Sequence, residues 1–202
     1  MIRSSFLLLP LVLLFLNACT GVGILTGAAA ITGISAAQEG GISGALSDAK
    51  IELLINEAWF QYDLDAFRKL QTTVKHGRVL IVGVVQNPDH RVEAIRLAWQ
   101  VPGVKQVINE AQVAESEGIK GFLKDAWITS RLRAGITFDR EIQSINYNID
   151  TVQGVIYLMG VAQNQAELNH IIEKARVVPG VQRVVSYVKL AGVEQNGDNT
   201  DL

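Results

Sequence analysis

The sequence is short of cysteine, proline, aromatic residues and net charge, and two of these shortages exclude a class of protein or a kind of bond. A single cysteine rules out a disulfide within the chain. A net charge of −2 over 202 residues argues against a nucleic-acid-binding protein, because such proteins present a strongly basic face. The composition is also unlike that of collagenous or largely disordered chains. The mature part is therefore expected to be globular, with room for one domain or two small ones.

The first nineteen residues have the layout of an export signal. Arg3 supplies a positive charge, and residues 6–16 are apolar apart from Pro10. This run is shorter than the roughly 20 residues that span a bilayer, and it leads into Leu-Asn-Ala-Cys at residues 16–19, which resembles a lipobox. We predict a lipoprotein signal peptide over residues 1–18 and acylation, palmitate included, at Cys19. The alternative is an ordinary signal peptide with an incidental cysteine.

Residue 20 is threonine, not the aspartate that retains lipoproteins at the inner membrane of enteric bacteria. This favours an outer-membrane location, lipid-anchored and facing the periplasm. Residues 19–46 carry one charge and are rich in glycine and alanine, which predicts a flexible linker. The alternative is a segment that packs through Gly23 and Gly27 against a helix or the membrane. Residues 192–202 are predicted to be a disordered tail.

The most informative feature is an internal repeat. Residues 77–87 (GRVLIVGVVQN) return as 154–164 (GVIYLMGVAQN), and residues 101–107 (VPGVKQV) return as 178–184 (VPGVQRV). Both pairs are 77 positions apart without a gap, and roughly a third of the positions from Gly77 to Val113 match their counterparts. The repeat predicts two structural units, one over residues 47–115 and one over residues 120–191.

Each unit shows the same order of elements. A helix is expected to open near Asp48 or Asp125, and a polar-glycine turn at residues 76–77 or 153–154 predicts a hairpin. Asn87 and Asn164 are suited to cap the second helix, which should stop before the Pro-Gly pair. The strands are expected at residues 70–75, 79–84 and 104–113 in the first unit, and at 145–149, 156–161 and 181–190 in the second. We predict an α+β fold of two tandem αββαβ units, each a three-stranded mixed sheet with two helices on one face.

This order, the glycines that bracket the hairpin and the Val-Pro-Gly-Val ending resemble the BON domain. Two such domains behind a lipobox resemble the dual-BON outer-membrane lipoproteins. The stretches DAWITSRLR at 125–133 and VIYLMG at 155–160 match that pattern. The resemblance covers residues 48–190, and it implies binding of anionic phospholipid, a contribution to envelope integrity and enrichment at division sites.

Signs of catalysis are sparse. His76, His90 and His170 do not recur at equivalent positions of the repeat, and no cluster has the spacing of metal ligands. The serines lack the context of a catalytic nucleophile. We therefore predict no enzyme activity, no catalytic residue, no metal and no cofactor.

The repeat separates core positions from surface positions. Ile128 and Leu132 match Ile51 and Ile55 and are predicted to be buried. Trp127 matches Lys50, so its indole is expected to be exposed. Trp59 and Trp99 are predicted to be packing residues, and Tyr157 and Met159 to lie on a sheet face.

Exposed aromatic and basic residues together suit an anionic membrane surface. Lys124, Trp127 and Arg131 follow helical spacing, and Phe122, Leu123 and Arg133 extend the candidate patch. Residues 118–140 hold five Lys or Arg and two Asp, whereas residues 47–65 hold one Lys and five Asp or Glu. An indole at headgroup depth beside cations is typical of interfacial binding. The alternative for Trp127 is packing against the other unit.

Three hypotheses follow. The first is an outer-membrane lipoprotein, attached by its N-terminal acyl chains, whose second domain binds anionic phospholipid. The second is a periplasmic adaptor that uses the same surface to bind an envelope or division protein. The third is a structural tether in which no surface substitution matters. Salt and lipid separate the first two, because lipid binding should need anionic headgroups and weaken with ionic strength.

Overall fold

The structure is a computed structural model that describes residues 41–192, the side chains of Ile42, Asp65 and Ala66 excepted. These residues belong to one compact unit. The predicted signal peptide, Cys19, most of the predicted linker and nearly all of the predicted tail lie outside the described residues. Within residues 41–192, no helix combines the length and hydrophobicity that crossing a membrane requires.

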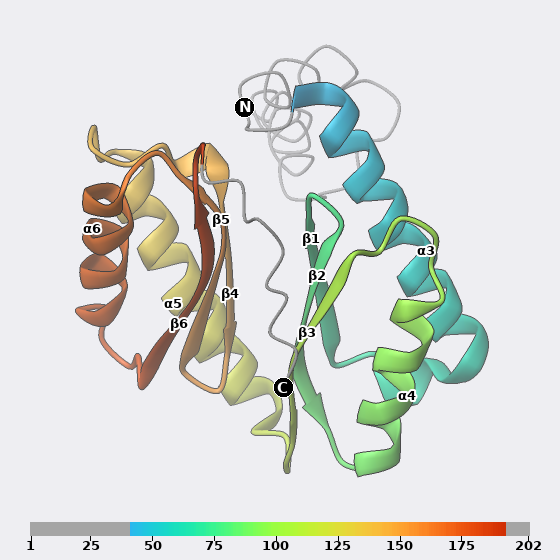
Figure 1. Ribbon diagram of the computed structural model, residues 1–202. Helices are drawn as coiled ribbons and strands as arrows, with labels where there is room; N and C mark the ends of the chain where they lie inside the picture. The colour runs from blue at the N-terminus through green and yellow to red at the C-terminus, as the bar shows by residue number, and fades with distance from the viewer. Residues whose placement is uncertain (1–40, 193–202) are drawn as a thin grey trace, which may run out of the picture. The chain divides into compact units, whose positions relative to one another are not determined.

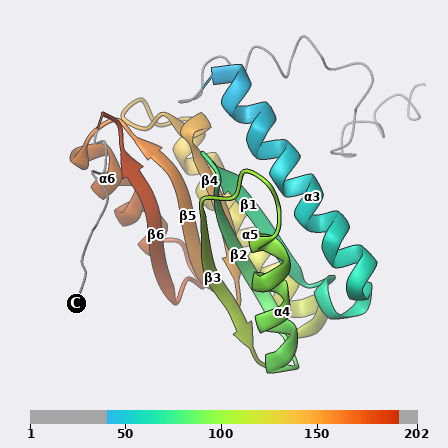
Figure 2. The same cartoon turned by 45° about the vertical axis from the view of Figure 1, so that its right-hand side comes forward.

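The first repeat forms a three-stranded mixed sheet covered by two helices (Figure 1). Strand β2 pairs antiparallel with β1 and parallel with β3, in the order β1-β2-β3. Helices α3 and α4 lie side by side on one face of this sheet (Figure 2). The elements are α3 (Gly41–Phe67), β1 (Leu70–Lys75), β2 (Arg78–Val85), α4 (Pro88–Trp99) and β3 (Gln106–Val113).

The second repeat has the same arrangement, with sheet order β4-β5-β6 and the same antiparallel and parallel pairings. Its helices again share one face of the sheet (Figure 1). The elements are α5 (Gly118–Thr137), the short 3-10 turn η2 (Ser144–Asn146), β4 (Tyr147–Val152), β5 (Val155–Ala162), α6 (Gln165–Arg176) and β6 (Arg183–Leu190). The predicted fold class is confirmed.

Local signals in the sequence account for the hairpins and the second helices. His76 and Gln153 take positive φ angles of 53° and 49°, and the glycine after each is also positive, as a two-residue hairpin turn requires. The side chain of Asn87 accepts a hydrogen bond of 2.9 Å from the Asp89 amide, and that of Asn164 accepts one of 2.9 Å from the Glu167 amide. Both predicted helix caps are confirmed.

Some element boundaries differ from the prediction. Helices α3 and α5 begin at Gly41 and Gly118, well before Asp48 and Asp125, so α3 enters the segment predicted as linker. A packed helix extends readily by adding one hydrogen bond for each further residue. Strand β4 was expected at residues 145–149 and occupies Tyr147–Val152 instead, because residues 144–146 form the 3-10 turn.

Each sheet buries both of its faces. One face packs under its own helices, where Ile51, Ile55, Ile128 and Leu132 are buried as predicted. The other faces contribute to a third core that holds residues from both repeats. Its members are Leu80, Val82, Val84, Val152, Val155, Tyr157 and Met159. Since each fully buried large apolar side chain contributes about 1.5–3 kcal/mol, this third core joins the two repeats firmly.

The two tryptophans predicted to pack behave differently. Trp59 is buried, and its indole N–H donates a hydrogen bond of 3.2 Å to the carbonyl of Ala94. Trp99, in contrast, is 51 % exposed, so the prediction for it was wrong. It is the last residue of α4, where the apolar face that the helix turns to the sheet has already ended at Leu97 and Ala98.

Candidate functional site

Helix α5 is positioned by an aspartate whose role the sequence did not reveal. The two carboxylate oxygens of Asp125 accept hydrogen bonds of 2.7 and 2.8 Å from the amides of Gln153 and Gly154 in the β4–β5 turn. Asp48 binds the amides of His76 and Gly77 in the same way, at 2.8 and 2.9 Å. The repeat placed Asp48 and Asp125 at equivalent positions, where we expected each to begin a helix. Their carboxylates instead bind the turn of the hairpin that follows.

A buried stripe fixes the rotation of α5 about its axis. Gly121, Ile128, Leu132 and Ile136 face the core of the second repeat. Because successive residues of an α-helix are rotated by about 100°, residues 120, 123, 124, 127 and 131 fall together on one side of the helix, next to this stripe. Burial of the stripe therefore determines which side chains are presented to solvent.

This exposed side of α5 combines large apolar groups with cations. Leu123 and Trp127 are 60 % and 50 % exposed, and Lys120, Lys124 and Arg131 are exposed beside them. We call these five residues the α5 face. Four of them were proposed from the sequence. Lys120 was missed as a member, although its position one turn before Lys124 was available as a signal.

The structure places the two remaining candidates elsewhere on α5. Phe122 is exposed but lines a groove of about 660 Å³ on another side of the helix, with Ala126, Thr129 and Ile149. Arg133 is exposed too, and its positive charge acts on the carboxyl of Asp150, which lies in β4. Phe122 and Arg133 therefore do not belong to the α5 face.

The first repeat has no such face. The residues equivalent to Lys120, Lys124 and Arg131 are Ser43, Ser47 and Leu54, and Lys50 stands in place of Trp127. Since the two repeats share one fold, this contrast comes from surface residues and not from the scaffold.

The fold and the repeat together point to a known domain, and a family model matches both halves of the chain. The model is that of the BON domain, and it matches residues 47–115 and 124–192. The chain belongs to the BON-domain family.

Several curated proteins are similar to this BON-domain chain. An uncharacterized protein in the gshII 5'region of Anaplasma centrale is 42 % identical over 146 residues, covering 72 % of this chain and 95 % of that one. The outer membrane lipoprotein DolP of Haemophilus influenzae is 28 % identical over 181 residues, covering 87 % and 90 %. The osmotically-inducible protein Y of Escherichia coli is 25 % identical over 146 residues, covering 71 % and 73 %.

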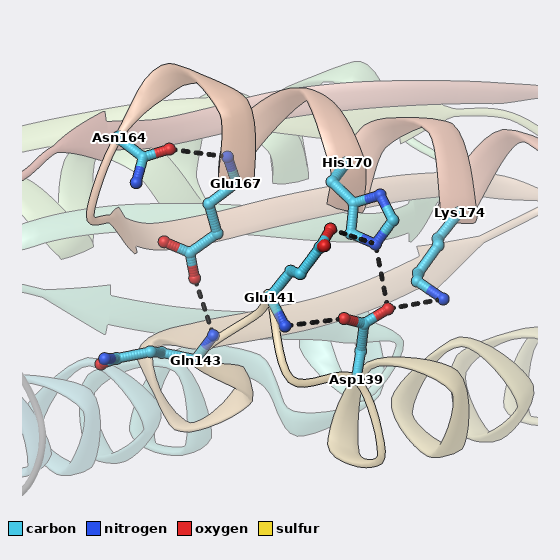
Figure 3. Close-up of polar contacts among 7 residues, drawn as sticks. All are labelled: Asp139, Glu141, Gln143, Asn164, Glu167, His170 and Lys174. Carbon is cyan, nitrogen blue, oxygen red and sulfur yellow. Dashed lines mark hydrogen bonds and ion pairs between the residues drawn. The ribbon is translucent and has the colours of Figure 1, made fainter.

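The second BON domain also contains a polar cluster centred on Asp139, between α5 and α6 (Figure 3). Its Oδ2 atom lies 2.8 Å from Nζ of Lys174 and 3.0 Å from Nε2 of His170, and its Oδ1 atom accepts a hydrogen bond of 2.9 Å from the Glu141 amide. The hydrogen bonds from Lys174, from the Glu141 amide and from His170 hold the pKa of Asp139 well below its usual range.

This cluster contains three groups that are able to bind a metal, which the sequence spacing did not indicate. One ligand atom each from Asp139, Glu141 and His170 lies within 4.8 Å of the others. The Lys174 ammonium, however, already neutralises the Asp139 oxygen that faces His170. A metal cation would have to displace it, so the contacts favour a structural role that ties the end of α5 to α6.

A second contact ties the same loop to α6 (Figure 3). The buried carboxylate of Glu167 accepts hydrogen bonds of 2.7 Å from the amides of Gln143 and Gln163. Because Glu167 and the Asp139 cluster together fix the connection from α5 to β4, the α5 face belongs to a helix that is held at Asp125, about two turns after its start, and at its C-terminal end by this loop.

Proposed function

We propose that this BON-domain chain is an outer-membrane lipoprotein, anchored through acylated Cys19, and that its second domain binds anionic phospholipid through the α5 face. Binding would support the integrity of the envelope, including at division sites, without turnover of a substrate. The observation that carries the proposal is Trp127, half exposed and surrounded by Lys120, Lys124 and Arg131 on a rigidly held helix.

The chemistry of the α5 face suits the boundary between headgroups and acyl chains. The indole of Trp127 and the side chain of Leu123 offer apolar surface at headgroup depth. Lysine and arginine side chains lay their apolar stems along such a surface while their charges meet lipid phosphates. Together these five side chains provide both the apolar surface and the positive charge that interfacial binding needs.

The location is supported by the N-terminal pattern and by the relatives. Leu-Asn-Ala-Cys at residues 16–19 has the order of a lipobox, and the similar protein of Haemophilus influenzae bears the name outer membrane lipoprotein.

A lipid anchor would also strengthen the binding of the α5 face to the membrane. Each cation near an anionic surface contributes about 1 kcal/mol, so three give weak binding that becomes useful at the high local concentration an anchor provides.

The test is co-sedimentation with vesicles of a chain that begins at residue 20 and therefore carries no acyl group. Both helix-covered cores and the third core lie within residues 41–192, so this chain keeps everything that holds the fold. Binding is compared on phosphatidylglycerol-containing and pure phosphatidylcholine vesicles. Trp127→Glu is the test variant, and Val92→Glu is the matched control, because Val92 is an exposed apolar residue of helix α4 in the first domain.

We expect binding to anionic vesicles alone, loss of binding in Trp127→Glu and unchanged binding in Val92→Glu, with both variants folded by circular dichroism. Absence of binding to either vesicle would overturn the lipid proposal. If a periplasmic protein instead bound the α5 face in detergent and without lipid, the adaptor function would take its place.

A further inference from the structure

Helix α3 of the first BON domain exposes an apolar stripe that its own domain does not use. Ile51, Ile55 and Trp59 occupy the buried side of the helix, whereas Leu46, Leu53 and Phe60 are exposed. The exposed residues are spaced by seven, which keeps them on one side of an α-helix over four turns. Leu53 and Phe60 are 67 % and 63 % exposed. Three large apolar side chains exposed along one side of a helix suit an interaction site.

The negative charge of α3 argues against a membrane as the binding partner of this stripe. The helix holds one lysine and five acidic residues, a formal charge of −4. An anionic lipid surface attracts basic segments and repels acidic ones. The occupant should therefore carry positive charge next to its apolar groups.

Helix α5 has this combination. It holds four basic residues and one aspartate, a formal charge of +3, and exposes Leu123 and Trp127 beside Lys120 and Lys124. We propose that the stripe Leu46–Leu53–Phe60 on α3 of one copy of this chain binds the α5 face of a second copy. The inference does not depend on the proposed lipid binding, because it rests on the complementary charges and apolar stripes of two helices of one chain.

Such a contact is heterologous, since it joins different surfaces of the two copies. Each added copy leaves one α3 stripe and one α5 face unused, so assembly continues as a row unless it closes into a ring. The contact also uses the face that we propose for lipid. Anionic lipid and a second copy would then compete for Trp127, and the balance between them would set how many copies remain free to contact the membrane.

The test is a complementation experiment on the chain that begins at residue 20, followed by sedimentation velocity at rising concentration. Phe60→Glu disrupts the α3 stripe and leaves the α5 face intact, whereas Trp127→Glu does the reverse. Both residues are exposed, and circular dichroism checks that each variant is folded. We expect the wild type to associate reversibly and less at high salt, and each variant alone to stay monomeric.

The decisive sample is the equimolar mixture of the two variants. It still contains one intact stripe and one intact α5 face, so it should form a dimer that grows no further. A monomeric wild type, association that survives Phe60→Glu, or a mixture that stays monomeric would each overturn the inference. Vesicle binding by Phe60→Glu reports separately on the lipid proposal, so failure of one idea is distinguishable from failure of the other.

Discussion

The hydroxyl of Thr73 donates a hydrogen bond of 2.9 Å to Oδ2 of Asp150, and these two residues occupy the same position in the two repeats, 77 residues apart. Tyr187 and Glu110 are also counterparts 77 residues apart, and they too are joined by a hydrogen bond. In a two-fold symmetric interface, residues on the axis meet their own equivalents. The two BON domains of this unit thus contact one another as a homodimer would, although they belong to one chain.

Asp150 makes this interface sensitive to pH. Burial, opposed by the Thr73 hydrogen bond and the charge of Arg133, raises the pKa of the Asp150 carboxyl. A carboxyl with a raised folded-state pKa favours the folded state when protonated, so its contribution is lost as pH rises above the unfolded value of about 3.8. Asp150→Asn keeps an oxygen acceptor for Thr73 and carries no charge. The quantity to compare is the melting temperature of Asp150→Asn minus that of wild type. We expect this difference to be more positive at pH 7 than at pH 4.

The measurement is thermal unfolding by circular dichroism at both pH values. An equal difference between variant and wild type at pH 4 and pH 7 would contradict the prediction. Glu52 provides a second readout, because the charge of Asp150 helps to raise its pKa, after the larger effect of burial. Asp150→Asn should therefore lower the pKa of Glu52 toward its ordinary value, which NMR titration of the carboxyl measures.

Asp139 should produce the opposite pH dependence. Its folded-state pKa is lowered, chiefly by Lys174, so its stabilising effect is present above the unfolded value of about 3.8 and is lost as pH falls below it. We expect Asp139→Asn to lower the melting temperature at pH 7 and to differ less from wild type at pH 3. Glu141→Gln is the control, since its carboxylate is exposed and lies 3.7 Å from Nε2 of His170, farther than the carboxylate of Asp139. A deficit of equal size at both pH values would refute this role.

Much of the fold was predictable because the repeat provides two independent sequences for each helix and strand, and features common to both indicate shared structure. The glycines that bracket each hairpin illustrate this. Gly83 and Gly160 have φ angles of 129° and 150°, and a Cβ atom there would lie 2.1 and 2.0 Å from backbone oxygens of Lys69 and Asn146. Only glycine fits such a position, so its recurrence at one offset was a reliable signal of shared structure.

The features that the sequence did not reveal depend on contacts between distant residues. Asp125 and the turn at residues 153–154 are 28 and 29 positions apart, and nothing in the local pattern indicates that they meet. Asp139 and His170 are brought together by folding in the same way. The α5 face was largely predictable because it needs only helical periodicity, and the same periodicity applied to every candidate would have separated Phe122 and Arg133 from it.

The aspartates that hold the hairpins are expected to be important for stability. Asp125→Ala leaves the part-buried amides of Gln153 and Gly154 without their acceptor, and a buried polar group left unsatisfied costs about 1–3 kcal/mol. We expect the free energy of unfolding to fall by that order, with a smaller loss for Asp48→Ala, because His76 is exposed and water can satisfy its amide. Urea denaturation measures it, and Asp89→Ala, an exposed aspartate near the start of α4, is the control. A loss below about 0.5 kcal/mol, the usual range for surface substitutions, would show that the hairpins hold without these bonds.

Lys120 separates the α5 face as the structure defines it from the patch proposed from sequence alone. It lies near the line of Trp127 and Arg131 on the helix, whereas Arg133 lies off it. Removing one cation from an anionic interface costs about 1 kcal/mol, which corresponds to about a fivefold loss of affinity. We therefore expect Lys120→Ala to weaken partitioning onto phosphatidylglycerol vesicles about fivefold, and Arg133→Ala to weaken it less.

The matched control is Lys50→Ala, at the position equivalent to Trp127 on the acidic helix α3. Raising the salt concentration should reduce the difference between Lys120→Ala and wild type, because screening removes the contribution that the variant lacks. Equal losses for Lys120→Ala, Arg133→Ala and Lys50→Ala would mean that net charge alone, and not a defined face of α5, governs binding.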